Sequence, residues 1–268
     1  MKRLLGSVLF FAFVLVAQPT ALDRDVQAPD SSYRYRLVTN RPGTGYTRYV
    51  RDMTSQSWRA ASEVNRTLWR HWVTIIRPEK VEGETALLFI TGGSNDGKPP
   101  ERPDPMLLNM ALTTSTVVAQ VRLVPNQPLV FSDDKQPRRE DEIIAYTWDK
   151  FLRGGDETWP LRLPMTKAAV RAMDTVTAFC AAPEGGGVRV QKFVVAGASK
   201  RGWTTWTTAA VDRRVVAVAP LVIDVLNVEK ALVHHWRAYG FWAPAINLRV
   251  PSSNLAGCLG FRNPHGQP

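Results

Sequence analysis

The chain has 268 residues, of which 44% are hydrophobic and 22% are charged, so it can bury one large core and is too apolar for an intrinsically disordered protein. Its formal net charge is +10 at pH 7, a value that can signal an anionic partner. The basic residues are interspersed with acidic ones and form no basic block or helix, which argues against nucleic-acid binding.

The N-terminal segment, residues 1–21, has the pattern of a signal peptide. Lys2 and Arg3 precede the apolar run LLGSVLFFAFVLVA, and small residues stand at Ala17 and Ala21. The run is shorter than the roughly 20 apolar residues that a membrane-spanning helix needs. We therefore expect the protein to be secreted or periplasmic. Because no clean Ala-x-Ala cleavage site is present, an uncleaved membrane anchor is the alternative, and only then do we expect contact with a membrane.

After a polar lead-in over residues 22–45, short apolar runs alternate with longer segments whose apolar residues recur every three or four positions. The runs predict strands and the periodic segments predict helices. We expect strands within residues 46–59, 68–78, 85–93, 115–125, 190–197 and 214–224, and helices within 140–152, 165–182, 201–211 and 228–240. This alternation predicts a mostly parallel sheet with helices on both faces. Residues 46–244 are thus expected to form one α/β domain.

In sheets of this kind, ligands bind beyond the carboxyl ends of the parallel strands. The segment KFVVAGASKRGWTTW, residues 192–206, leads from an apolar strand through Gly-x-Ser into a helix. Such a turn lifts a serine hydroxyl clear of the sheet, so Ser199 is a candidate nucleophile. Gly197 and Gly202 flank this elbow, although Arg201 occupies the position where a Gly-x-Ser-x-Gly motif has its second glycine. The alternative is that Ser199 only caps the following helix.

A serine nucleophile also needs donors that stabilise the oxyanion. The backbone N–H of Lys200 is expected to be one donor, because it begins the helix after the serine. The second is expected from the turn ITGGSN, which follows the strand 85–93 and offers the N–H groups of Gly93 and Ser94. The side chains of Lys200 and Arg201 either attract an anionic group or face solvent.

Where a serine nucleophile lies on a strand–turn–helix elbow of this kind, the catalytic acid and histidine follow it in the sequence. Asp224 ends a predicted strand at the required edge and is the best acid available, with capping of the next helix as the alternative. His235 is the candidate base. Its neighbour His234 points about 100° away on the same helix, so at most one of the two faces the site, and packing is the alternative role for both. His71 lies in an early strand between tryptophans, where we expect a structural role.

Metal and cofactor chemistry have no support in the sequence. No His-x-x-x-His, Cys-x-x-Cys or mixed His and carboxylate spacing typical of a metal site occurs. The TGGSNDGK segment does not have the spacing of a phosphate-binding loop. We therefore expect neither a metal nor a cofactor.

Six longer motifs carry a resemblance: ITGGSNDGKPP, VPNQPLVF, EDEIIAYTWDKFL, WPLRLPMTKAAVRAMDTV, GASKRGWTTW and APLVIDVLNV. Together they resemble the PhoPQ-activated pathogenicity-related protein family, an exported α/β-hydrolase-like group that includes autocrine proliferation repressor proteins. The resemblance covers roughly residues 46–244. It implies an α/β-hydrolase core, with Ser199 at the nucleophile position and Gly92-Gly93 at the oxyanion turn.

The C-terminal segment, residues 245–268, has no strong period and is rich in Pro, Gly, Ser and Asn. Proteins that resemble this one continue well past YGFWAP. Residues 245–268 are therefore either a natural irregular tail or a chain end foreign to the preceding fold. In the second case the last strands and the acid–histidine pair are missing, and the chain is a truncated or frame-shifted hydrolase.

Two functions are compatible with these observations. The first is an exported serine hydrolase, an esterase or peptidase that acts on a small ester or peptide and whose competence depends on an acid–histidine pair. The second is a non-catalytic secreted signalling or interaction protein that uses the same fold to bind a protein partner.

Overall fold

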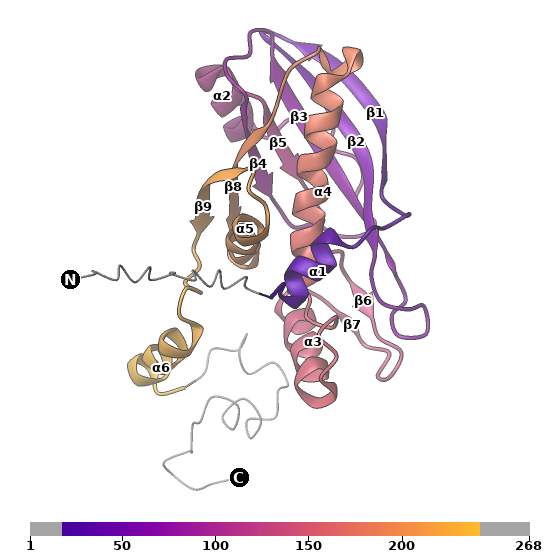
Figure 1. Cartoon of the computed structure of the whole chain (residues 1–268), viewed down its shortest axis with the longest axis vertical. Coiled ribbons are helices and arrows are strands. Elements are labelled where there is room, and N and C mark those ends of the chain that lie inside the picture. The colour runs from indigo at the N-terminus through magenta and orange to yellow at the C-terminus, as the bar shows by residue number, and fades with distance from the viewer. Residues whose placement is uncertain (1–17, 242–268) are drawn as a thin grey trace, which may run out of the picture.

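A seven-stranded mixed sheet forms the centre of the molecule (Figure 1). The computed structural model describes residues 18–241, and its strands lie in the order β1-β2-β3-β5-β4-β8-β9. Their bounds are β1 Arg34–Gly43, β2 Tyr46–Ser57, β3 Leu68–Pro78, β4 Thr85–Ile90, β5 Val118–Val121, β8 Lys192–Ala198 and β9 Val215–Leu221. β1, β2, β3 and β5 pair antiparallel, whereas β5, β4, β8 and β9 pair in parallel. The α/β-hydrolase-like fold expected from the sequence is confirmed, and its parallel half carries the serine turn.

Helices cover both faces of this sheet (Figure 1). On one face, α4 (Arg162–Ala181) packs against α1 (Ala21–Gln27) and α5 (Lys200–Val211). On the other face, α2 (Pro105–Thr114) packs against β3 and β5. Two consecutive residues of β3 pack on opposite faces of the sheet. Ile75 belongs to the large core cluster under α4, whereas Ile76 packs with Leu107 and Ala111 of α2. Successive residues of a strand point to opposite faces, so each face has its own core.

Three further elements lie beyond the carboxyl ends of the parallel strands (Figure 1). They are α3 (Asp141–Gly154), α6 (Val228–Tyr239) and the short hairpin of β6 (Leu129–Val130) and β7 (Pro137–Arg138). α3 and α6 were both expected from their apolar periodicity. Their position matters for function, because this is the end of the sheet at which ligands bind in α/β folds.

The N-terminal part of the fold differs from the sequence-based expectation. Residues 22–45 were expected to be a lead-in outside the domain, but β1 pairs with β2 along its whole length and α1 packs on α4. β1 gave no apolar signal because it is an edge strand with most of its residues exposed. α2 was also missed, since its apolar residues surround the helix and Met106 and Met110 are exposed. The sequence does contain one signal for the start of α2, because Asp104 caps the helix with its side chain and Pro105 follows at the first helical position.

His71 has the structural position that the sequence suggested. It is fully buried in β3, with Nε2 2.9 Å from Ser55 Oγ and Nδ1 3.1 Å from the Arg122 carbonyl oxygen. The neutral ring satisfies both contacts when Nδ1–H donates to the carbonyl and the Ser55 hydroxyl donates to Nε2. Burial lowers the pKa of His71 to about 4. The ring is therefore uncharged at neutral pH and shielded from any substrate.

Among residues 18–241, no helix is both long enough and apolar enough to cross a membrane. The predicted signal segment and the C-terminal segment from residue 245 onward lie outside the described residues, except for residues 18–21.

Candidate active site

Ser199 occupies a sharp turn between β8 and α5. Its backbone has φ 55° and ψ −125°, a conformation that non-glycine residues rarely adopt and that costs roughly 1–3 kcal/mol. Its N–H donates to the Leu221 carbonyl oxygen at 2.8 Å, which anchors the turn to the end of β9. The Ser199 side chain makes no capping hydrogen bond to α5, although it precedes the helix. The hydroxyl is thus partly exposed on a strained turn without a capping role.

The two elbow glycines allow β8 and α5 to approach closely. A Cβ atom added to Gly197 would lie 2.8 Å from the carbonyl oxygen of Arg201. One added to Gly202 would lie 3.0 Å from the carbonyl oxygen of Gly197. Backbone, which cannot rotate away as a side chain can, is an obstacle in both cases, and at Gly202 the side chain of Ile223 lies closer still, with its Cγ2 at 2.6 Å. The Gly-x-Ser-x-x-Gly spacing therefore serves the same close strand–helix packing as the commoner motif, with the second glycine one residue later.

The predicted oxyanion turn lies beside this elbow. β4 and β8 are adjacent parallel strands in which Ile90 is paired with Gly197, so Gly92 and Gly93 leave the sheet next to Ser199. Within residues 18–241, the amides of Gly93 and Ser94 donate to no backbone or side-chain acceptor. The N–H groups in the first turn of α5 have no intrahelical partner either. The N–H groups predicted to bind an oxyanion thus follow the carboxyl ends of two adjacent strands, β4 and β8.

Glu140, at the start of α3, binds both basic side chains that follow the serine. Its carboxylate accepts two hydrogen bonds from Arg201, both at 2.8 Å, and pairs with Lys200 Nζ at 2.9 Å. A fourth hydrogen bond comes from Gln127 Nε2 at 2.6 Å. Burial alone would raise the pKa of Glu140, but the hydrogen bonds from Arg201, Lys200 and Gln127 lower it to about 2. The carboxylate is therefore ionised at all physiological pH values.

The same network reaches the oxyanion turn. Gln127 Nε2 also donates to the Gly93 carbonyl oxygen at 3.0 Å, and Arg201 Nε donates to the Val124 carbonyl oxygen at 2.6 Å. Arg201 lies directly against Gly92, because a Cβ atom there would be 2.3 Å from Arg201 Nη2. Glu140 consequently connects the elbow helix to the oxyanion turn through hydrogen bonds on both sides.

The sequence-based alternatives for Lys200 and Arg201 need correction. Neither side chain faces solvent, since their exposed fractions are 10% and 11%, and both are neutralised by carboxylates of the chain itself. Lys200 makes a second ion pair with Asp141 at 3.2 Å. Sequence reasoning missed Glu140, the first residue of the EDEIIAYTWDKFL motif, because its partners Lys200 and Arg201 lie about 60 residues further along the chain.

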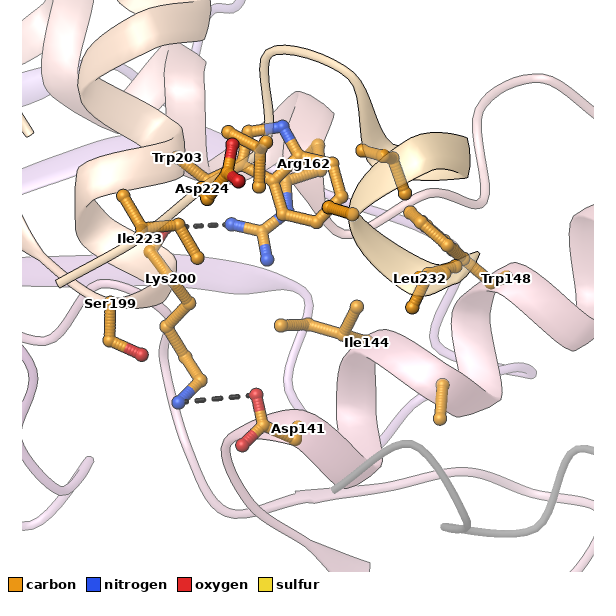
Figure 2. Close-up of a pocket in the computed structure, with 14 residues that line it drawn as sticks. Asp141, Ile144, Trp148, Arg162, Ser199, Lys200, Trp203, Ile223, Asp224 and Leu232 are labelled. Carbon is orange, nitrogen blue, oxygen red and sulfur yellow. Dashed lines mark hydrogen bonds and ion pairs between the residues drawn. The ribbon is translucent and has the colours of Figure 1, made fainter. Parts of the chain in front are cut away.

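A pocket with a volume of about 290 Å³ opens beside the elbow (Figure 2). Its lining is mostly apolar and comes from α3, α4, the elbow, the segment after β9 and α6, namely Asp141, Ile144, Ala145, Trp148, Arg162, Ser199, Lys200, Trp203, Ile223, Asp224, Val225, Val228, Ala231 and Leu232. Figure 2 shows Ser199 and the Lys200 side chain on one side of this space and Ile144, Trp148 and Leu232 on another. An apolar pocket with a few polar groups is the usual form of a small-molecule site.

Arg162 is the charged residue that sequence reasoning overlooked in this pocket. It begins α4, is 6% exposed, and its Nη1 donates to the carbonyl oxygen of Lys200 at 2.7 Å. The guanidinium lies over the Trp203 ring, 4.2 Å from the ring centroid. Its contact with the residue after Ser199 places this cation beside the elbow.

Asp224 lines the pocket together with Ser199, whereas His235 does not. Asp224 is exposed, and the cap of α6 is provided by Asn227, whose side chain accepts from the Lys230 amide at 3.2 Å. Capping, the alternative role for Asp224, is therefore performed by another residue.

His235 lies on α6 with its ring 4.9 Å from that of Tyr239. It follows Ala231 and Leu232, which line the pocket, by four and three positions. Residues at these spacings share one face of a helix, so His235 continues the pocket-facing side of α6 by one turn. His234 points to a different side and is exposed.

In the part of the chain that the structure describes, no three His, Cys, Asp or Glu side chains gather in a way that could hold a metal ion.

The comparison with solved structures finds similarity to two esterases. The chain is 17% identical to acetyl xylan esterase 1 from Thermoanaerobacterium sp. JW/SL YS485, with a TM-score of 0.48 over 89% of this chain and 68% of that one. It is 13% identical to the glucuronoyl esterase from Solibacter usitatus, with a TM-score of 0.45 over 74% of this chain and 55% of that one.

The sequence comparisons are more specific. The chain is 39% identical to autocrine proliferation repressor protein A from Dictyostelium discoideum over 242 residues, which are 90% of this chain and 48% of that protein. The chain thus spans about half the length of this relative. Residues 22–252 match the PhoPQ-activated pathogenicity-related protein family. The chain belongs to the PhoPQ-activated pathogenicity-related protein family.

Proposed function

We propose that this protein is a serine hydrolase that cleaves an ester or amide of a small molecule, with Ser199 as the nucleophile. The observation that carries the proposal is the strained backbone of Ser199, at φ 55°, which holds a non-capping hydroxyl at the mouth of a pocket. Strain of this kind persists only where the surrounding structure enforces it, and it concentrates at functional sites.

In the proposed reaction, the Ser199 oxygen attacks the carbonyl carbon and the N–H groups of Lys200, Gly93 and Ser94 bind the oxyanion. The serine proton passes to a histidine and then to the leaving group, and water subsequently hydrolyses the acyl-enzyme. We assign the histidine to His235 and the acid to Asp224. The pocket-facing side of α6 supports the first assignment, and the shared pocket with Ser199 supports the second.

Covalent labelling with a fluorophosphonate tests the nucleophile. The full chain is expected to be labelled, and Ser199→Ala is expected to abolish labelling. Ser132→Ala, which removes an exposed serine far from the elbow in sequence, is the control and should be labelled like the unmodified chain. Failure of the unmodified chain to react, or labelling that survives in Ser199→Ala, would overturn the proposal.

The base is tested by two adjacent variants. His235→Gln is expected to slow labelling by about 100-fold, the lower end of the usual contribution of a general base. His234→Gln is the matched control, because it removes the same chemical group from an exposed position on another side of α6. Equal rates in the two variants would exclude His235 as the base while leaving Ser199 as the nucleophile.

A non-catalytic role in secreted signalling or protein interaction is the second candidate. It is favoured by the 39% identity to a protein described as an autocrine proliferation repressor, and by apolar side chains exposed near the end of β9 and on α6. Val222 and Leu226 are 84% and 74% exposed, and Tyr239 is 63% exposed. Such groups are typical of a surface that binds another protein. The absence of fluorophosphonate labelling in a folded chain would favour this role.

We also propose that the protein is exported. The proposal is supported by the basic, then apolar, then small-residue pattern of residues 1–21. Expression with and without this segment, followed by fractionation, tests it, because only the full chain should leave the cytoplasm.

A further inference from the structure

Arg162 is a buried cation that has no carboxylate partner within residues 18–241. Its exposed fraction is 6%, and its Nε is buried without any acceptor in the described part of the chain. Nη1 has the Lys200 carbonyl oxygen at 2.7 Å and the Met165 sulfur at 3.8 Å. A guanidinium has five N–H donors, so most of its hydrogen-bonding capacity is unused.

The nearby carboxylates are occupied by other cations. Glu140 is paired with Lys200 and Arg201, and Asp141 is paired with Lys200 at 3.2 Å. Asp224 lines the same pocket but makes no ion pair with Arg162 within residues 18–241. Burial of a charge without a partner is unfavourable, and burial lowers the pKa of the Arg162 guanidinium. The group nevertheless stays protonated at neutral pH, because arginine does not lose its proton in proteins under these conditions.

The free side of the guanidinium faces the pocket. Figure 2 shows it pointing into the space between Lys200, Ile144 and Leu232. Trp203 stacks against it at 4.2 Å, and Trp148 contacts Trp203 edge-on with 5.6 Å between ring centroids. This packing fixes the orientation of the guanidinium, so its unused donors are held ready for a ligand that enters the pocket.

We propose that Arg162 binds the carboxylate of a ligand whose apolar portion fills the remainder of this pocket. Two properties support this chemistry. A planar guanidinium matches a carboxylate in a bidentate geometry. The remaining walls are apolar side chains of α3 and α6, including Ile144, Val228 and Leu232, which suit an alkyl or aryl arm.

If the proposed function is correct, this ligand is the acyl group of the substrate. Arg162 contacts the residue that follows Ser199, so an acyl chain in the pocket would place its carbonyl at the elbow and its carboxylate on Arg162. The substrate would then be an ester or amide of an apolar acid that carries a second, free carboxylate. The binding claim itself does not require that Ser199 reacts.

Calorimetric titration separates the two claims. In the Ser199→Ala full chain, 4-phenylbutyrate is expected to bind about tenfold more tightly than its neutral counterpart 4-phenylbutyramide. Adding Arg162→Gln is expected to remove this preference, so that the acid and the amide bind equally. Leu232→Ala is the control, because Leu232 lines the apolar part of the pocket, so its loss should weaken both ligands without changing their ratio.

Arg162→Lys covers the case in which Arg162→Gln does not fold. The lysine keeps the positive charge but lacks the planar guanidinium that binds a carboxylate at two points. The acid is therefore still expected to bind more tightly than the amide, but by a smaller factor. Equal affinity for acid and amide in the Ser199→Ala chain, no binding of either ligand, or an acid preference that persists in folded Arg162→Gln would overturn the proposal. An acid preference without fluorophosphonate labelling of the unmodified chain would retain the carboxylate site and reject the proposed hydrolase function.

Discussion

Glu140 and Arg201 form a two-point ion pair in which each carboxylate oxygen accepts one hydrogen bond at 2.8 Å. Arg201 follows the candidate nucleophile by two residues and lies against Gly92 in the oxyanion turn. Glu140 has a strained backbone of its own, with φ 51° and ψ −121°. This one carboxylate therefore determines how two separate loops are placed relative to each other.

Replacement of Glu140 by glutamine should destabilise the protein by about 2–3 kcal/mol, because it leaves Arg201 as a buried cation without a counter-charge and leaves Lys200 with Asp141 alone. Fluorophosphonate labelling should also slow, since the oxyanion turn loses its connection to α5. Urea unfolding and labelling kinetics measure the two effects. Asp141→Asn is the matched control, because its single, more exposed ion pair should contribute at most about 1 kcal/mol. If Glu140→Gln and Asp141→Asn lost similar amounts of stability and labelling rate, Glu140 would not be the carboxylate that holds α5 and the oxyanion turn together.

Gly92→Ala tests the close approach between the oxyanion turn and Arg201. The new methyl group would lie 2.3 Å from Arg201 Nη2, so the guanidinium must leave Glu140 or the turn must move. We expect slower labelling and a stability loss of roughly 1–3 kcal/mol, the usual cost of overpacking. Gly154→Ala is the control, because nothing lies within 4 Å of the added atom and alanine favours a helix. An unaffected Gly92→Ala protein would show that the turn is not held in this position.

The strain at Ser199 is measurable by comparing two substitutions. Ser199→Gly and Ser199→Ala both remove the hydroxyl, but glycine tolerates φ 55° whereas alanine does not. We expect the glycine variant to be more stable than the alanine variant by about 1–2 kcal/mol, with both variants unlabelled. Thermal unfolding of the pair checks this directly. An alanine variant as stable as the glycine variant would mean that the turn is relaxed.

The burial of the neutral His71 ring leads us to expect that the protein loses stability in mild acid. The pKa of His71 is lowered from 6.5 to about 4 in the folded protein. Between these two pH values the ring is protonated in the unfolded chain and neutral in the folded chain. Stability is complete above pH 6.5 and falls by about 3 kcal/mol as the pH decreases to about 4. Urea unfolding at several pH values measures it. The decline should disappear in His71→Asn and persist in His234→Gln, and a pH-independent stability in this range would contradict the buried, neutral ring.

Protonation of Glu140 should cause a second decline of protein stability, at lower pH than that of His71. The pKa of Glu140 is lowered from 4.5 to about 2, so the unfolded chain is protonated first as the pH falls below 4.5. The stability that the ionised carboxylate contributes is therefore lost between pH 4.5 and about 2. This lower window should be missing in Glu140→Gln, whereas the window of His71 should remain.

The fold could be predicted from the sequence where a segment has one strong period. The strands expected within residues 85–93 and 190–197 are present as β4 (Thr85–Ile90) and β8 (Lys192–Ala198), and their register places Gly92, which follows β4, next to the elbow. β1 could not be predicted in this way, because an exposed edge strand has no apolar pattern to read.

The serine turn was also accessible from sequence, because a strand, Gly-x-Ser and a helix stand next to each other in the chain. Glu140 and Arg162 were not, because their roles depend on contacts made across about 60 and about 40 residues. Glu140 and Arg162 both stand in motifs that carry the family resemblance, EDEIIAYTWDKFL and WPLRLPMTKAAVRAMDTV, but neither motif shows which distant residues they contact. Only the contacts that α3 and α4 make with the residues after Ser199 bring Glu140 and Arg162 to the candidate site.

The most direct test of the central claim is the identification of the acylated residue after brief reaction with p-nitrophenyl acetate. The chain is quenched in acid and digested, and the modified peptide is sequenced by mass spectrometry. The account predicts a single acetyl group on Ser199 of the peptide that contains GASK, and none in Ser199→Ala. An unmodified Ser199, or an acetyl group that lies on another residue, would contradict it.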